Sequence, residues 1–185
     1  VISHGYSHNM VLIGNSGIGR KIITKLLCYI HRIDCRILRV SQEYHGNNQF
    51  ANTLKDTLKT AGIDGNRILL YIEDCQLIDN VMLEYLNQLV TTGDVIGLFE
   101  DKELETLLLP IKEEYRQNGM TQHKSVYDYF VSRIQRNLYV ALSMDPNNKK
   151  FISLCQTNPS LIIHCNVMWM GNQWNNQSIM HYAKP

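Results

Sequence analysis

The residues with the clearest chemical signature are three glycines near the start of the chain, Gly14, Gly17 and Gly19, followed by Arg20 and Lys21. Their spacing is that of G-x-x-x-x-G-K-[ST], a loop whose backbone N–H groups wrap nucleotide phosphates at the N-terminus of a helix. In that motif the lysine reaches the β- and γ-phosphates, and the Ser or Thr hydroxyl coordinates Mg²⁺. Here arginine stands in the lysine position and lysine stands in the hydroxyl position. The pattern predicts a phosphate cradle without the metal-coordinating hydroxyl.

The two substitutions change the reach and shape of the positive charge. Arg20 keeps the charge but replaces a compact ammonium with a longer, planar guanidinium. Lys21 lies one residue further on, about 100° around a helix with 3.6 residues per turn, so it cannot simply take the place of the motif lysine. An alternative remains open, in which the glycines form a strand-to-helix turn that binds no ligand.

Two adjacent carboxylates, Glu73 and Asp74, follow a strongly apolar stretch. In an open α/β sheet, ligands bind beyond the carboxyl ends of the strands, so these groups could meet the metal of a nucleotide. P-loop enzymes commonly place Asp first, for Mg²⁺, and Glu second, to orient the attacking water. Here the order is reversed, and the shorter Asp74 would have to reach the water. The alternative is that the pair caps the following turn.

Asp145 follows the apolar segment 138–144 and is expected at the same edge of the sheet. A neutral asparagine there could hold a water near the γ-phosphate. An aspartate about 4 Å from a phosphate charge would instead be repelled by roughly 4 kcal/mol at an effective dielectric of 20. If the transition state feels that repulsion, it costs on the order of a thousandfold in rate. The alternative is a turn residue in the run Asp-Pro-Asn-Asn.

The elements that must position these residues alternate along the chain. Apolar stretches predict strands at 10–13, 35–40, 67–72, 138–144 and 166–170, and helical periodicity predicts helices at 19–33, 47–61, 80–91, 126–137 and 149–158. The first helix carries one apolar face, formed by Ile22, Ile23, Leu26, Leu27 and Ile30. Residues 101–119 form a charged, partly helical excursion that is expected to break at Pro110. The order predicts an α/β fold, a mostly parallel sheet flanked by helices.

Bulk composition narrows the class of protein. The apolar share of 44% is typical of a globular domain, and 185 residues suffice for one substantial core. A net charge of +1 gives no reason to expect a nucleic acid or an anionic membrane as a partner. The five scattered cysteines include no C-x-x-C pair, which favours reduced thiols in the cytoplasm. No apolar run approaches the length of a membrane span.

The chain resembles the dynein heavy chains, specifically the large α/β subdomain of the fourth AAA+ module of their motor ring, a P-loop NTPase fold. The resemblance runs from about residue 9 to residue 179, and its specificity comes from the collinear order of soft motifs. The matching stretches are 9–14 with 17–20, 58–63, 73–76, 83–87, 92–99, 136–140 and 158–161. Within the family, the resemblance favours the dynein of intraflagellar transport.

The resemblance implies a role for each site residue. The Walker A segment would bind the nucleotide through Gly14, Asn15, Ser16, Gly17, Ile18, Gly19, Arg20, Lys21 and Ile22. Glu73 and Asp74 would occupy the Walker B pair, with Glu73 a weak Mg²⁺ ligand, and Asp145 would occupy the sensor position. His164 matches the position from which some dyneins send an arginine finger into the neighbouring site, a residue that can be worth about 10³–10⁵ in turnover. Histidine there puts that contribution in doubt.

The resemblance also implies the biological setting. Residues 1–171 would form the AAA+ subdomain of a longer chain, and 172–185 a linker toward a small helical subdomain and a stalk. The cofactor would be ATP or ADP, with or without Mg²⁺. The partners would be neighbouring AAA+ modules, dynein accessory chains and, through the stalk, a microtubule. The expected location is the cytoplasmic cytoskeleton, including the cilium or axoneme.

Three functions follow from these observations. Because the glycine cradle is kept while the hydroxyl, the carboxylate order and the sensor residue are changed, we expect a module that holds nucleotide and hydrolyses it poorly, with a structural or regulatory role in the ring. An active ATPase module, in which Arg20 and Asp74 suffice, is the first alternative. A scaffold module that binds no nucleotide is the second.

Overall fold

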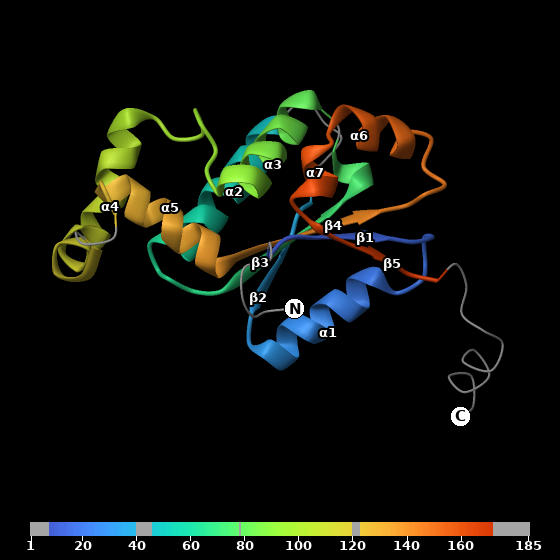
Figure 1. Ribbon diagram of the computed structural model, residues 1–185, viewed down its shortest axis with the longest axis horizontal. Helices are drawn as coiled ribbons and strands as arrows, with labels where there is room; N and C mark the ends of the chain where they lie inside the picture. The colour runs from blue at the N-terminus through green and yellow to red at the C-terminus, as the bar shows by residue number, and fades with distance from the viewer. Residues whose placement is uncertain (1–7, 40–45, 78, 120–122, 172–185) are drawn as a thin grey trace.

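A single parallel sheet organises the chain. The computed structural model describes residues 8–39, 46–77, 79–119 and 123–171, so the linker expected at 172–185 lies outside the described residues. Within them, five strands pair in the order β2-β3-β4-β1-β5, all parallel (Figure 1). The strands are β1 Met10–Ile13, β2 Asp34–Ile37, β3 Ile68–Glu73, β4 Leu138–Met144 and β5 Asn166–Trp169. The predicted α/β fold with a parallel sheet is confirmed.

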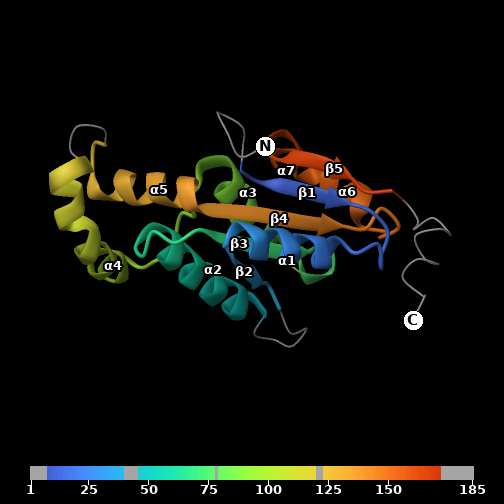
Figure 2. The ribbon, with the colours of Figure 1, turned by 90° about the horizontal axis from the view of Figure 1, so that it is seen from below.

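Helices connect successive strands, as parallel pairing requires. They are α1 Arg20–His31, α2 Gly46–Gly62, α3 Asn80–Thr92, α4 Asp101–Glu114, α5 Val126–Asn137, α6 Phe151–Thr157 and α7 Ser160–Ile163. A 3₁₀ turn, η1 Asp74–Gln76, follows β3, and a π-helical turn, η2 Tyr115–Gly119, extends α4. Helices α4 and α5 project beyond the end of the sheet where β4 begins (Figure 2).

The main core lies between the sheet and the helices α2, α3, α6 and α7 (Figure 1). Phe50, Leu54 and Leu58, which are four residues apart, lie on one face of α2, where each is only 1% exposed. Every residue of β4 is buried, because this strand has a strand on each side and covered faces above and below. Such a strand reads as a continuous apolar run, which is why its bounds could be predicted to the residue.

Helix α1 packs on the other face of the sheet and turns its apolar side outward. Thr24 and Cys28 are its buried residues, whereas Ile22, Leu26 and Ile30 are 72%, 56% and 61% exposed. In the described part of the chain, a small cluster beneath α1 forms the core on this side. The predicted amphipathic helix is therefore present, but its apolar face does not pack on the sheet of this chain.

Helix α4 runs through Pro110, so the break expected there is wrong. Proline removes one donor, the bond to the carbonyl of Thr106 four residues earlier. Both residues are exposed, so water can satisfy that carbonyl, while Ile111, the next residue, is buried and holds the helix on the core. Packing on one side thus outweighs the lost hydrogen bond on the other.

The segment predicted as one helix at 149–158 ends earlier and is followed by a second helix. Helix α6 stops at Thr157, and α7 begins after Pro159. Asn158 sits between them, buried, and its amide donates to the Leu154 carbonyl at 3.2 Å while its oxygen accepts from Asn87 of α3 at 2.7 Å. Because Asn158 bonds to both α6 and α3, it fixes the position of the bend between α6 and α7.

In the described residues, no helix is long and apolar enough to cross a bilayer.

The close packing of α2 on α5 yields a stability prediction at Gly62. A methyl group there would approach Phe130 Cε2 to 2.3 Å and Ile134 Cγ1 to 3.1 Å. Overpacking typically costs about 1–3 kcal/mol, more than the roughly 1 kcal/mol that alanine gains over glycine in a helix. Gly62→Ala is therefore expected to lower the free energy of unfolding by about 1–2 kcal/mol in urea titrations. The matched control is Lys59→Ala, which changes an exposed residue of the same helix; equal stability of the two variants would contradict the packing described here.

Candidate functional site

The glycine loop leaves the carboxyl end of β1 and leads directly into α1. Its start is held by a hydrogen bond from Gly14 N to the Met144 carbonyl at 3.1 Å. Gly17 and Gly19 have φ angles of 83° and 95°, a region that L side chains rarely adopt. No atom lies within 4 Å of the position that a Cβ of Gly17 would occupy. The loop is thus shaped by its glycines and is open at its tip.

The first turn of α1 offers backbone donors to an anion. The first N–H groups of a helix have no partner within the helix, and the helix dipole favours negative charge there. Gly19, the N-cap residue, provides no side-chain hydrogen bond, and the first turn contains no acidic residue. The loop and the helix start therefore offer backbone donors of the kind that bind a phosphate group.

The two cationic side chains of the motif point to different strands. Arg20 donates from Nη1 to the carbonyl of Met144, the last residue of β4. Lys21 places Nζ 3.3 Å from Oε1 of Glu73, the last residue of β3. Both members of this ion pair are partly exposed, 40% for the lysine and 32% for the glutamate, so the pair faces the edge where the loop opens.

Asp74 uses both carboxylate oxygens to hold the local backbone. Its Oδ1 accepts from Cys75 N at 2.9 Å, at the start of η1. Its Oδ2 accepts from Asp145 N at 3.2 Å and from the Asn148 amide at 2.8 Å. Asp74 thus joins the start of η1 to the loop after β4. Glu73, the N-cap residue of η1, makes no side-chain capping hydrogen bond, so the pair does not cap the turn together.

Asp145 is likewise engaged by protein donors. Its Oδ2 accepts from Ser16 N in the glycine loop at 3.0 Å, and its Oδ1 accepts from Asn147 N at 2.9 Å. Asn147 in turn donates from its side-chain amide to Asn15 Oδ1 at 3.1 Å. The loop after β4 therefore connects the glycine loop on one side with Asp74 on the other.

The glycine loop, the end of β3 and the loop after β4 meet at one edge of the sheet. Strand order places β4 between β1 and β3, and the pairing register sets Ser143 opposite both Leu12 and Glu73. Sequence reasoning missed three contributors: the Met144 carbonyl, Asn148 and the pairing of Lys21 with Glu73. The run Asp-Pro-Asn-Asn signalled a turn, but nothing in it indicated which strand the amide of Asn148 would reach.

Tyr71 adds no charge to this edge at neutral pH. Its ring is buried in β3, and burial raises the pKa of its phenol above the ordinary value. Among the smaller causes, the Ser143 hydroxyl and the Arg20 guanidinium lower the pKa, whereas the carboxylates of Glu73 and Asp74 raise it. The phenol therefore stays protonated, and the local charges are those of the glycine-loop cations and the three carboxylates.

These residues suit a nucleotide phosphate better than they suit the usual magnesium ion. Among the described residues, no group of three or more His, Cys, Asp or Glu is arranged to hold a metal. The hydroxyl that would ligate Mg²⁺ is replaced by Lys21, and the Glu73 carboxylate beside it already pairs with that lysine. The Asp74 and Asp145 carboxylates are bound by protein N–H groups.

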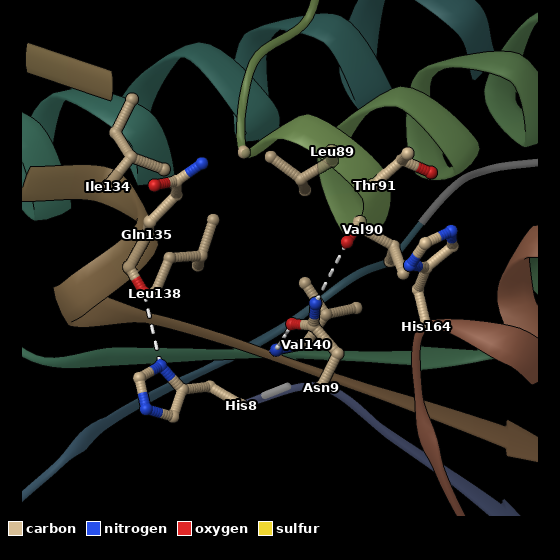
Figure 3. Close-up of a pocket in the computed structure, with 11 residues that line it drawn as sticks. His8, Asn9, Leu89, Val90, Thr91, Ile134, Gln135, Leu138, Val140 and His164 are labelled. Atoms are coloured by element: carbon tan, nitrogen blue, oxygen red, sulfur yellow. Dashed lines mark hydrogen bonds between the residues drawn. The ribbon is translucent and has the colours of Figure 1, made fainter. Parts of the chain in front are cut away.

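His164 lies at the opposite edge of the sheet, two residues before β5 begins. There it lines a cavity of about 240 Å³ together with His8, Asn9 and Gln135. Figure 3 shows His164 and Gln135 on opposite sides of this cavity, with Asn9 between them. Asn9 is fixed by Val140 N, which donates to its Oδ1 at 3.1 Å. Because the strands are parallel, His164 is separated from the glycine loop of this chain by the length of the sheet.

Comparison with known proteins identifies close relatives over almost the whole chain. A family model described as "P-loop containing dynein motor region D4" matches residues 1–184. Cytoplasmic dynein 2 heavy chain 1 of Homo sapiens is 39% identical over 171 residues, which are 92% of this chain and 4% of that protein. The same protein of Chlamydomonas reinhardtii is 36% identical over 176 residues, 95% of this chain and 4% of the relative. The chain thus spans about 4% of the length of the curated relatives it matches.

The contacts of Asp74 predict that it is a structural residue. Asp74→Ala removes an acceptor shared by three donors, and hydrogen bonds to a charged group are worth about 1.5–3 kcal/mol each. Because Asp74 is only partly buried, water can replace part of these bonds, so we expect the variant to lower the free energy of unfolding by about 2–3 kcal/mol, less than their sum, in denaturant titrations. Glu73→Ala is the matched control, since its partly exposed ion pair contributes about 0–1 kcal/mol. A loss as small in Asp74→Ala as in the control would show that its hydrogen bonds do not hold the loops.

Proposed function

Because this chain belongs to the dynein heavy chain family, in which it matches the P-loop containing motor region D4, we propose that it holds a nucleotide and hydrolyses it poorly. In this proposal the bound nucleotide, ADP or ATP, has a structural or regulatory role in the motor ring. The observation that carries the proposal is a contrast within the site. The tip of the glycine loop at Gly17 is open, while both oxygens of Asp74 and of Asp145 accept hydrogen bonds from protein donors, one of which is Ser16 N of the loop.

The glycine loop supports the binding half of the proposal. A positive φ at Gly17 and Gly19 lets the backbone turn toward a ligand, and the tip of the loop is open. The N-terminus of α1 presents backbone donors without a competing side-chain cap. Arg20 needs only to leave the Met144 carbonyl to pair with a phosphate, which binds guanidinium strongly through parallel hydrogen bonds.

The carboxylates support the slow-hydrolysis half. Hydrolysis of a phosphoanhydride needs a group that positions the attacking water and charges that stabilise the transferred phosphoryl group. Asp74 has both oxygens in hydrogen bonds that hold the loops after β3 and β4, and Asp145 has both in hydrogen bonds to backbone N–H groups. Using either one to orient water would require breaking contacts that hold the site together.

The outward face of α1 supports placement in a larger assembly. Exposed apolar side chains gathered on one helix mark a surface that is covered in the working protein. The relatives that match are about twenty-five times longer than this segment, by the 4% that the match covers. We propose that other parts of the heavy chain, including neighbouring AAA+ modules, cover this face, and that the whole motor acts on microtubules with dynein accessory chains in the cytoskeleton and the cilium.

Nucleotide binding is tested first on the intact heavy chain, with the other nucleotide sites disabled. We expect ADP to bind, and Arg20→Ala to weaken the affinity about tenfold, equivalent to roughly 1.4 kcal/mol. The matched control is Lys25→Ala, an exposed cation one turn further along α1, which should leave the Kd unchanged. Calorimetry that detects no ADP binding at millimolar concentration would favour the scaffold alternative and overturn the proposal.

Hydrolysis is tested by single-turnover measurements on the same heavy chain. We expect ATP to be cleaved at this site at a rate well below about 1 s⁻¹, the low end of typical enzymes. The background rate comes from Gly17→Val, which places a branched side chain where φ is 83° and should abolish the phosphate loop. A rate near 1 s⁻¹ above this background would instead establish the active ATPase alternative.

A further inference from the structure

The ion pair between Lys21 and Glu73 occupies the part of the site where a P-loop enzyme holds its metal ion. In the P-loop motif the position of Lys21 belongs to a hydroxyl that holds Mg²⁺. In this chain the Lys21 ammonium lies 3.3 Å from Glu73, the carboxylate at the end of β3. In a P-loop site with the usual residues, the metal ion lies between the hydroxyl at the start of the helix and a carboxylate at the end of a strand. In this chain, the Lys21 ammonium already supplies a positive charge at that position.

We propose that this site binds the phosphate groups of a nucleotide such as ADP without a divalent metal ion. In this proposal the Lys21 ammonium is the resident cation, the positive charge that takes the place of the metal ion. The proposal rests on the proposed function, because it requires that nucleotide binds at the glycine loop at all. Neither the similarity to dynein heavy chains nor the glycine motif determines which positive charge neutralises the phosphates in this chain.

Three features of the pair favour this role. Lysine ends in a compact, strongly hydrated point charge with three donors, so Nζ can keep Glu73 and still donate to a phosphate oxygen. The lysine side chain is 40% exposed, so a ligand at the edge of the sheet can reach it. It also belongs to the first turn of α1, whose backbone donors face the same ligand, so two sources of positive potential converge.

The surrounding groups disfavour a divalent ion in the same place. A Mg²⁺ ion there would meet the like charge of Lys21 and compete with it for Glu73. Magnesium demands near-octahedral oxygen coordination, normally from one or two carboxylates, waters and the phosphates. Asp74 and Asp145 would each have to give up backbone hydrogen bonds to become ligands. The lysine meets none of these obstacles.

The test is the metal dependence of ADP binding to the intact heavy chain with its other nucleotide sites disabled. For the unsubstituted chain, the Kd for ADP should be the same within about threefold in excess Mg²⁺ and in excess EDTA. Lys21→Thr restores the hydroxyl of the motif and removes the cation. We expect it to weaken binding in EDTA at least about tenfold and to recover affinity when Mg²⁺ is added. Lys25→Thr, the same exchange at an exposed site of α1, should stay metal-independent.

Electron paramagnetic resonance distinguishes a site that binds no metal ion from a site that binds one weakly. With Mn²⁺ as the probe ion, electron paramagnetic resonance should detect no coupling between the metal and ADP phosphorus in the unsubstituted chain, and should detect it in Lys21→Thr. A second variant, Glu73→Gln, removes the lysine's partner without touching the lysine, and should keep ADP binding in EDTA. Loss of that binding would count against the lysine as the sufficient cation.

The outcomes distinguish the two proposals. Binding that appears only with Mg²⁺, together with Mn²⁺–phosphorus coupling in the unsubstituted chain, overturns the resident-cation role and leaves the proposed function standing. Absence of ADP binding under both conditions overturns the proposed function, and the resident cation with it. Equal binding in Mg²⁺ and EDTA that becomes metal-dependent in Lys21→Thr supports both.

Discussion

The pairing of β4 between β1 and β3 is the constraint on which the rest of the site depends. Parallel register brings the ends of three strands to one level, with Ser143 opposite both Leu12 and Glu73. From there Asp145 accepts from Ser16 N on one side, and its own N–H donates to Asp74 on the other. A strand that is buried along its whole length thus positions the polar loop that unites the glycine loop with the carboxylates.

Sequence reasoning predicted the parts of this arrangement that depend on periodicity and on the polarity of parallel strands. The bounds of β4 follow from its uninterrupted apolar run, and the shared edge follows because parallel strands end on one side. It could not predict which donor meets which carboxylate. That Lys21 reaches Glu73, or that Asn148 reaches Asp74, depends on side chains from elements more than fifty residues apart.

The same limit applies to two features of the fold. An amphipathic pattern indicates that a helix has an apolar face, but it does not say what covers that face. In α1 the residues toward the sheet are Thr24 and Cys28, and the apolar side is turned away. Pro110 was expected to end a helix on local grounds, yet the burial of Ile111 holds α4 together through it. In both cases a tertiary contact decided a question that the local pattern left open.

The carboxylates of the site are bound by protein donors. A hydrolytic P-loop site needs carboxylates that are free to hold metal and water, whereas here Asp74 and Asp145 are used to join loops. Since Asp145 binds the glycine loop itself, that loop cannot shift without disturbing the loop 145–148 and, through Asp74, the turn η1. Rigidity of this kind suits a site that holds one ligand for a long time. Turnover requires repeated rearrangement of water and metal, so the contacts that stabilise this edge of the sheet are the basis on which we propose slow hydrolysis there.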